Sequence, residues 1–281
     1  FVPWSETAAF KRERLRSLQL QLPQETVAFF NLKDPLLKDA ALRSILSQSI
    51  DRSELEELVK PHASLVDSPF PFLSFGVSSS TDLEMNRQAL EKLGWKLSPG
   101  ENVRKSRATL PLTLTIDVPN QPDLLKIADY LQQRWSLIGA KVDIQTKETG
   151  VLLQNALQDR SSYQIILWNI LLSPTQDVSP FWSSLNTVGQ GLNLSHLANQ
   201  QVDQALAEIQ SATSSDRLFI ARRKLNTAIQ KQTPALFLVK PAYSYVVAER
   251  VKGVQDLRVS RPSDRLLQAN TWYVKSRCEW N

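Results

Sequence analysis

The sequence predicts an α/β fold in which a mixed, mostly parallel sheet is covered by helices on both faces. Between residues 109 and 172, segments with the apolar patterns of strands alternate with segments that have the i, i+3, i+4 spacing of amphipathic helices. The last of them, YQIILWNILL (163–172), is largely apolar on both faces, as a strand inside a parallel sheet is. Strand, helix, strand, helix, strand is the order that builds such a sheet.

The segments before this run predict separate short elements. Asp51 and Glu54 form a D-x-x-E capping box, so a helix should begin at Arg52. Residues 61–85 contain three prolines and six serines outside any period, which predicts an extended loop. Ahead of these we expect a short basic helix, a strand and an amphipathic helix, at residues 8–19, 26–32 and 35–50.

The alternating run itself predicts a βαβαβ unit over residues 109–169. Its longer helix, QPDLLKIADYLQQRWSLIGA, places four large apolar side chains on one face, which should be buried against the sheet: Leu124, Ile127, Leu131 and Trp135. Two more amphipathic helices follow, and Ser214 is the expected N-cap of the second. The strand ALFLVK (235–240) should end at Pro241 because proline cannot donate to a sheet ladder.

The residues that usually carry catalysis or bind metals are scarce. Cys278 is the single cysteine, which excludes an intrachain disulfide and a cysteine metal cluster. His62 and His196 lie far apart, and neither has metal-ligand spacing. No G-x-S-x-G is present, and GQGLNL (189–194) lacks the third glycine of a dinucleotide loop. We therefore expect no enzyme activity, no metal and no cofactor.

Charge and hydropathy restrict the partners. The formal net charge of +5 is modest, and charges of both signs are interspersed, so we expect no nucleic-acid partner. We also expect the protein to be a monomer. No apolar run reaches the length of a membrane-spanning helix. The chain opens on FVPWSETAAF, without the features of a signal peptide, and we interpret it as a fragment of a longer protein.

The stretch ILWNILLSPTQDVSPFW (166–182) predicts a possible binding surface. A strand leads into a loop that has Trp168 and Trp182 at its ends and one carboxylate, Asp177, between them. Ligands of open α/β sheets bind beyond the carboxyl ends of strands. Two interpretations stay open: the rings fill the edge of the core, or they form a recognition surface.

The segment FFNLKDPLLKDAALRSILSQSIDRSEL (29–55) resembles extracellular solute-binding family 5, the peptide- and nickel-type binding proteins of bacterial ABC importers. Seven residues follow the family pattern in this segment: Asn31, Asp39, Leu42, Arg43, Ile50, Asp51 and Arg52. The likeness continues through ALEKLGWKLSPGENVRKS, IADYLQQRWSLIGAKVDI and YQIILWN to the segment that ends at ERVKG. It covers roughly residues 26–255 in one collinear run.

The resemblance implies the C-terminal portion of a two-lobed, type II periplasmic-binding fold. Residues 1–26 would be a remnant of the first lobe, 27–243 the second, ligand-binding lobe and 244–281 a return segment to the first lobe. The implied function is capture of a peptide or related small solute by hinge closure, followed by delivery to ABC permease subunits. The implied location is extracytoplasmic, in the periplasm or at the cell surface with a lipid anchor ahead of Phe1. Two alternatives are the solute-sensing domain of a cytosolic transcription regulator and a degenerate scaffold that binds no solute.

The resemblance also suggests the site. Peptide-binding members often carry W-x-x-D, and this chain has leucine at the acid's position. We expect Trp168 to end its strand with part of its ring exposed, and the loop 171–181 to project from the sheet. Asp177 is the nearest carboxylate, and Thr149 stands where some peptide binders have tryptophan. The candidate ligand-binding residues are Trp168, Asn169, Leu171, Asp177, Trp182, Thr149 and Tyr243.

Overall fold

The computed structural model describes residues 14–76, 81–159, 162–172, 175, 177–188, 191–255, 259 and 261–274. One sheet has the order β1-β7-β2-β6-β4-β5, with β3 paired to β7. Its strands are β1 (Leu15–Gln21), β2 (Gln24–Phe30), β3 (Ala63–Leu65), β4 (Thr113–Pro119), β5 (Lys141–Lys147), β6 (Ile165–Leu171) and β7 (Ala235–Ala248). A two-stranded sheet joins β8 (Val251–Lys252) to β9 (Tyr273–Val274).

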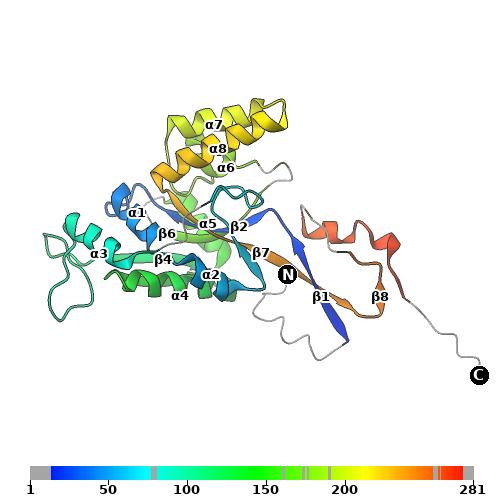
Figure 1. Ribbon diagram of the computed structural model, residues 1–281, viewed down its shortest axis with the longest axis horizontal. Coiled ribbons are helices and arrows are strands. Elements are labelled where there is room, and N and C mark those ends of the chain that lie inside the picture. Colours follow the sequence, from blue (N-terminus) through cyan, green and yellow to red (C-terminus); the bar gives the residue numbers. More distant parts are fainter. Residues whose placement is uncertain are drawn as a thin grey trace, which may run out of the picture.

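Helices form a layer on each side of the sheet (Figure 1). The α helices are α1 (Ala40–Gln48), α2 (Arg52–Val59), α3 (Leu83–Lys92), α4 (Pro122–Ser136), α5 (Thr149–Gln158), α6 (Ser179–Trp182), α7 (Gln200–Ser211) and α8 (Ser215–Gln232). Short 3-10 helices are η2 (Ser184–Thr187), η3 (Pro262–Leu266) and η4 (Ala269–Thr271). One apolar cluster joins the sheet to α1, α2 and α4, and a second joins its other face to α5, α6, α7 and α8. The α/β class with two helical layers is confirmed.

The expected βαβαβ unit is present as β4, α4, β5, α5 and β6. Strand β4 pairs in parallel with both β5 and β6. The four apolar residues of α4 named above are buried, with at most 2% of each exposed. Trp135 also donates from its indole Nε1 to the carbonyl of Leu46, 3.0 Å away, so α4 is fixed to α1 by a hydrogen bond as well as by packing.

The sheet is mixed, but it is not mostly parallel. Only the β4–β5 and β4–β6 pairings of the described strands are parallel, whereas β1, β2, β3, β6 and β7 are joined by antiparallel pairings. The βαβαβ pattern predicted the parallel part correctly. The antiparallel part joins strands that are far apart in the chain, which local patterns do not report.

Two local predictions near the ends of the chain were wrong. Residues 15–21 form strand β1 and not the second half of a basic helix, because they pair with residues 242–248 of β7. Strand β7 does not end at Pro241 but continues to Ala248. Pro241 lies where β7 ends its pairing with β2 and begins its pairing with β1, so the missing N–H falls at a change of partner. We call β1 with residues 242–248 the arm.

The predicted start of α2 is confirmed, but only the Asp51 half of the capping box is seen, since the Glu54 carboxylate accepts from Arg134 instead. Asp51 is the N-cap of α2 and accepts from the backbone N–H groups of Ser53 and Glu54. The loop over residues 61–85 contains the short strand β3 and gives way to α3 at Leu83, while residues 77–80 lie outside the described chain. Among the described helices, none has the length and hydropathy needed to cross a membrane.

Candidate ligand-binding site

One edge of the sheet includes two of the candidate residues, Leu171 at the end of β6 and Thr149 shortly after β5. Strands β4, β5 and β6 are parallel, so their carboxyl ends, Pro119, Lys147 and Leu171, meet there. Strand β2 starts at the same edge, with Gln24 opposite Leu171. We call this the carboxyl edge. The arm extends away from the rest of the sheet at this edge, since the partner of β7 changes from β2 to β1 there (Figure 1).

Trp168 lies inside β6 and not at its end. It is the fourth residue of the strand, opposite Val27, and β6 continues to Leu171 because its pairing with β2 continues. The side chain is half-buried, as expected, and packs against the apolar cluster beneath α5 to α8. The expected position at the strand end was therefore wrong, and the expected partial exposure is confirmed.

Asn169 and Leu171 lie on the opposite face of β6 from Trp168, because side chains alternate along a strand. The Oδ1 atom of Asn169 accepts a hydrogen bond of 2.6 Å from the hydroxyl of Thr26 on β2. Leu171 is 47% exposed. The carboxyl edge thus presents an apolar side chain at the position where the resemblance led us to look for an acid.

Thr149 begins a helix, and Asp177 lies two positions before one. Asp177 is half-buried and accepts the backbone N–H of Ser179 at 2.9 Å, at the start of α6. Thr149 is the exposed first residue of α5, two positions after β5 ends, and so lies at the carboxyl edge. The expected projection of the loop 171–181 involves residues 173, 174 and 176, which lie outside the described chain.

Trp182 is not on the surface of the protein. Its side chain is completely buried, with ring centroids 5.6 Å from Phe29 and 5.5 Å from Phe237. An aromatic residue enclosed in this way fills the core and offers no area to a solute. Tyr243 is a backbone partner of Leu20 in the arm, and its side chain lies outside the described part of the chain.

Sequence reasoning missed a buried carboxyl at the carboxyl edge. Glu25 is the second residue of β2, opposite Ile170, and is completely buried. Neither of its carboxyl oxygens has a hydrogen-bond partner. Burial raises the pKa of Glu25 well above its usual value; the charge of Lys240 opposes this rise and that of Asp67 adds to it. The protonated, neutral form is therefore favoured.

A second carboxyl that we missed lies across the same edge. Asp117 of β4 is 2% exposed, and the ammonium group of Lys147 lies 2.7 Å from its Oδ2. Burial raises the pKa of Asp117, and the hydrogen bond and charge of Lys147 counteract the rise. The available signal was an acidic residue inside an apolar strand pattern, QETVAFF for Glu25 and TLTIDV for Asp117.

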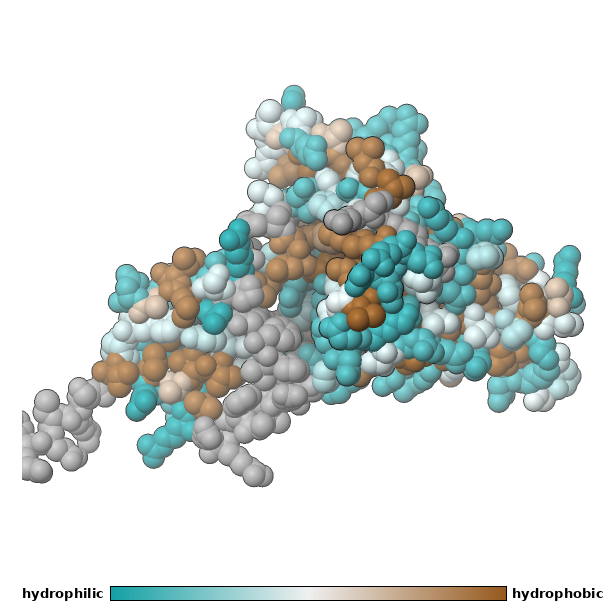
Figure 2. Space-filling model, turned by 180° about the vertical axis from the view of Figure 1, so that it is seen from behind, coloured by the Kyte–Doolittle hydropathy of each residue, from teal (hydrophilic) through white to brown (hydrophobic). Residues whose placement is uncertain are grey.

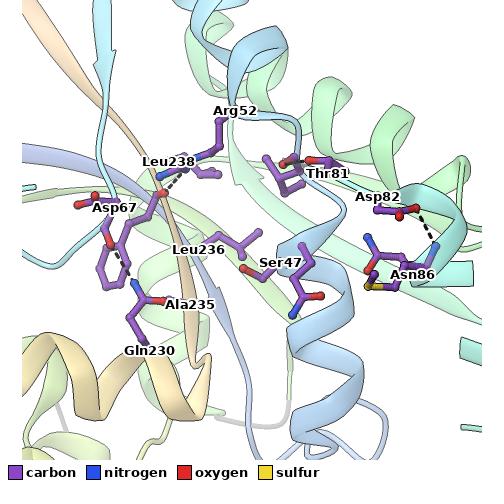
Figure 3. Close-up of a pocket in the computed structure, with 14 residues that line it drawn as sticks. Ser47, Arg52, Asp67, Thr81, Asp82, Asn86, Gln230, Ala235, Leu236 and Leu238 are labelled. Atoms are coloured by element: carbon purple, nitrogen blue, oxygen red, sulfur yellow. Dashed lines mark hydrogen bonds between the residues drawn. The ribbon is translucent and has the colours of Figure 1, made fainter. Parts of the chain in front are cut away.

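A separate cavity of about 400 Å³ lies between α1, the start of α3 and the first half of β7 (Figure 3). Arg52 closes one side, where its guanidinium donates to the carbonyls of Phe237 and Val66. Gln230 donates to the carbonyl of Asp67, 2.8 Å away. None of the seven candidate residues lines this cavity, so it is distinct from the carboxyl edge. In the described residues no group of three or more His, Cys, Asp or Glu side chains could hold a metal ion.

Comparison with known proteins gives a match over most of the chain. Residues 2–191 match the family described as bacterial extracellular solute-binding proteins, family 5, middle part. A curated protein, the peptide transport periplasmic protein SapA of Haemophilus influenzae, is 22% identical over 236 residues, which cover 80% of this chain and 40% of that protein.

Two solved structures show the same fold. The oligopeptide-binding protein AppA of Bacillus subtilis, in complex with a nonapeptide, has a TM-score of 0.82 at 19% identity and covers 98% of this chain. NikZ of Campylobacter jejuni, in complex with Ni(L-His), has a TM-score of 0.81 at 19% identity and also covers 98%. The chain spans 55% and 56% of those two proteins, about half their length.

Proposed function

Because the chain belongs to the bacterial extracellular solute-binding proteins of family 5, we propose that it is the ligand-binding, C-terminal portion of the substrate-binding component of an ABC importer. It captures a peptide or related small solute outside the cytoplasm, by closure of two lobes about a hinge, and delivers it to permease subunits. The family is one of binding proteins, in line with the expectation that the chain is not an enzyme. The relatives are described as transport or binding proteins, which favours an importer over a transcription regulator.

The observation that best supports this proposal is that the chain connects the arm to the proposed lobe twice at the carboxyl edge. We call this pair of connections the double crossing. The chain passes between the lobe and the arm twice, once between β1 and β2 and once within β7. Next to these crossings, Leu172 donates to the carbonyl of Pro23 at 2.8 Å, and Gln24 donates to that of Pro241 at 3.3 Å. Hinged domains rotate about a few such terminal residues of their elements. The proposed lobe, residues 27–243, ends close to this double crossing.

The apolar surface on the arm side supports a second lobe. Four large apolar residues between η3 and β9 are 49% to 76% exposed: Leu266, Leu267, Tyr273 and Val274. Figure 2 shows apolar side chains gathered on this side of the molecule, at the left. Exposed apolar area of this kind marks an interaction surface. We assign it to contact with the remainder of the first lobe, and so assign residues 14–26 and 244–274 to that lobe.

The proposed ligand contacts are candidate residues whose side chains are exposed or half-buried. Trp168 supplies a half-buried ring, Leu171 an apolar side chain, and Thr149 and Asp177 polar groups at helix starts. Trp182 is omitted because it is buried. The solved relatives were captured with a nonapeptide and with Ni(L-His), so the same fold accommodates both solute classes. For this chain we propose a peptide or similar small solute.

Mass spectrometry and calorimetry test the proposal. A two-lobed protein that carries this chain should co-purify with a small solute that native mass spectrometry can identify. Trp168→Ala should weaken binding of that solute by about 1–3 kcal/mol, the typical loss for an aromatic anchor. Val151→Ala, at an exposed site on α5, is the matched control and should leave affinity unchanged. Equal affinity for the parent and the Trp168 variant would remove the carboxyl edge from the binding site.

A further inference from the structure

A groove of about 490 Å³ runs along the outer surface of the helical hairpin formed by α7 and α8. The residues that line it come only from these two helices and include Glu208, Phe219, Ile220, Arg223, Lys224 and Lys231. None of them belongs to the carboxyl edge. The solute-binding proposal therefore gives this groove no role.

The groove has an apolar part that is open to solvent. Phe219 is 49% exposed and Ile220 is 54% exposed, while Ala205 and Ala228 are almost completely buried between the helices. The Phe219 ring stacks on Phe75, with centroids 6.1 Å apart and planes at 28°, which fixes its orientation. Figure 2 shows apolar side chains among hydrophilic ones at the top of the molecule, where α7 and α8 lie in Figure 1. These two large apolar side chains line the hollow, where a docked partner would cover them.

The charges beside this apolar part are mainly positive. Lys224 forms an ion pair with Glu208 across the two helices, with 2.7 Å between Nζ and Oε2. Arg223 and Lys231 also line the groove, and among the described residues neither has an acidic partner. They lie eight residues apart on α8, which corresponds to about 12 Å along the helix axis. The groove therefore carries two cations in excess.

We propose that this groove is a docking site for an acidic amphipathic helix of a protein partner. A helix laid along α8 would place apolar side chains over Phe219 and Ile220 and carboxylates about two turns apart beside Arg223 and Lys231. A concave surface between two helices suits a third helix, whereas a flat lipid surface would leave the hollow unfilled. Charge complementarity then selects an acidic helix over a basic one.

Selection from a displayed library of helical peptides against the 281-residue chain tests this. The selected sequences should carry acidic residues seven or eight positions apart, with apolar residues between them. A synthetic peptide of the selected sequence should bind at least tenfold more weakly to the double variant Arg223→Glu, Lys231→Glu and to Ile220→Ser. The exposed lysines of a matched double variant, Lys92→Glu and Lys96→Glu, lie elsewhere and should leave the affinity unchanged.

Three outcomes would overturn the proposal. One is selected peptides that lack the acidic pattern, and another is peptide binding that none of the groove variants weakens. The third is failure to select any peptide. If the chain then sediments with phosphatidylglycerol vesicles in a way that depends on Arg223 and Lys231, a membrane is the occupant of the groove. Each variant is also titrated with solute in the two-lobed protein. If the groove variants leave the solute affinity unchanged, the outcome of the peptide experiment tests the groove alone and not the proposed import function.

Discussion

Asp117 and Lys147 form an ion pair at the carboxyl ends of β4 and β5, with 2.7 Å between Oδ2 and Nζ. The Asp117 side chain is 3% exposed and the Lys147 side chain 30% exposed. If the pair were broken, water would therefore solvate the lysine better than the carboxylate. A buried charge that loses its partner is strongly unfavourable. The pair thus supplies the buried Asp117 carboxylate with a partner at the sheet edge at which we place the solute.

The first prediction concerns this pair. Lys147→Met should lower the free energy of unfolding at pH 7 by about 1–3 kcal/mol, because it leaves a buried carboxylate without a partner. Lys141→Met is the control: Lys141 pairs with Asp143 on the same strand at an exposed site, so the change should be below about 1 kcal/mol. Urea denaturation of both variants measures the difference. Equal losses for the two lysines would contradict the assignment.

Glu25 gives a prediction about pH. Its pKa is raised in the folded chain, whereas an unfolded glutamate has a pKa of about 4.3. The folded state is therefore favoured below pH 4.3, and stability is lost as pH rises from there towards the raised folded pKa, since the unfolded chain ionises first. Because glutamine does not ionise, Glu25→Gln should abolish this loss of stability at higher pH. The variant should match the parent near pH 4 and have the higher melting temperature at pH 7 to 8.

The control for Glu25 is Glu249→Gln, at an exposed position after β7. It should leave the dependence of melting temperature on pH unchanged. If Glu25→Gln instead lowered the melting temperature at pH 7, the Glu25 carboxylate would be ionised and stabilising in the folded chain, and its assignment as a buried neutral acid would be wrong.

The two tryptophans of the stretch 166–182 should behave differently. Trp182→Ala removes a completely buried ring and should cost about 3–5 kcal/mol of stability. Trp168→Ala removes a half-buried ring and should cost clearly less. Denaturant titrations of the 281-residue chain compare them directly. A larger loss at Trp168 than at Trp182 would contradict the division between a binding residue and a core residue.

Local sequence signals predicted several of the helices and strands that form the sheet and its helical layers. The buried face of α4 follows from apolar spacing alone, and the start of α2 follows from the capping pair Asp51 and Glu54. Both depend on residues within a few positions of each other, so a single chain segment contains the whole signal. The half-buried state of Trp168 was instead expected from the family resemblance, which placed the residue beside a ligand cleft.

The features that the sequence did not predict depend on distant partners. Residues 15–21 are a strand because residues 242–248 pair with them, more than 200 positions away. The burial of Trp182 depends on Phe29 and Phe237, which come from two other strands. Glu25 was missed because its burial and its raised pKa arise only when β2, β6 and β7 are assembled. Such tertiary contacts override local propensity.

The most direct test of the central claim, that this chain supplies one lobe of a two-lobed binding site, is isothermal titration calorimetry with the solute that co-purifies with the two-lobed protein. The two-lobed protein should bind it with micromolar or tighter affinity. The 281-residue chain should bind at least 100-fold more weakly, because half of the contacts around the solute are absent. Micromolar binding by the chain alone, equivalent to about 8 kcal/mol, would contradict the claim.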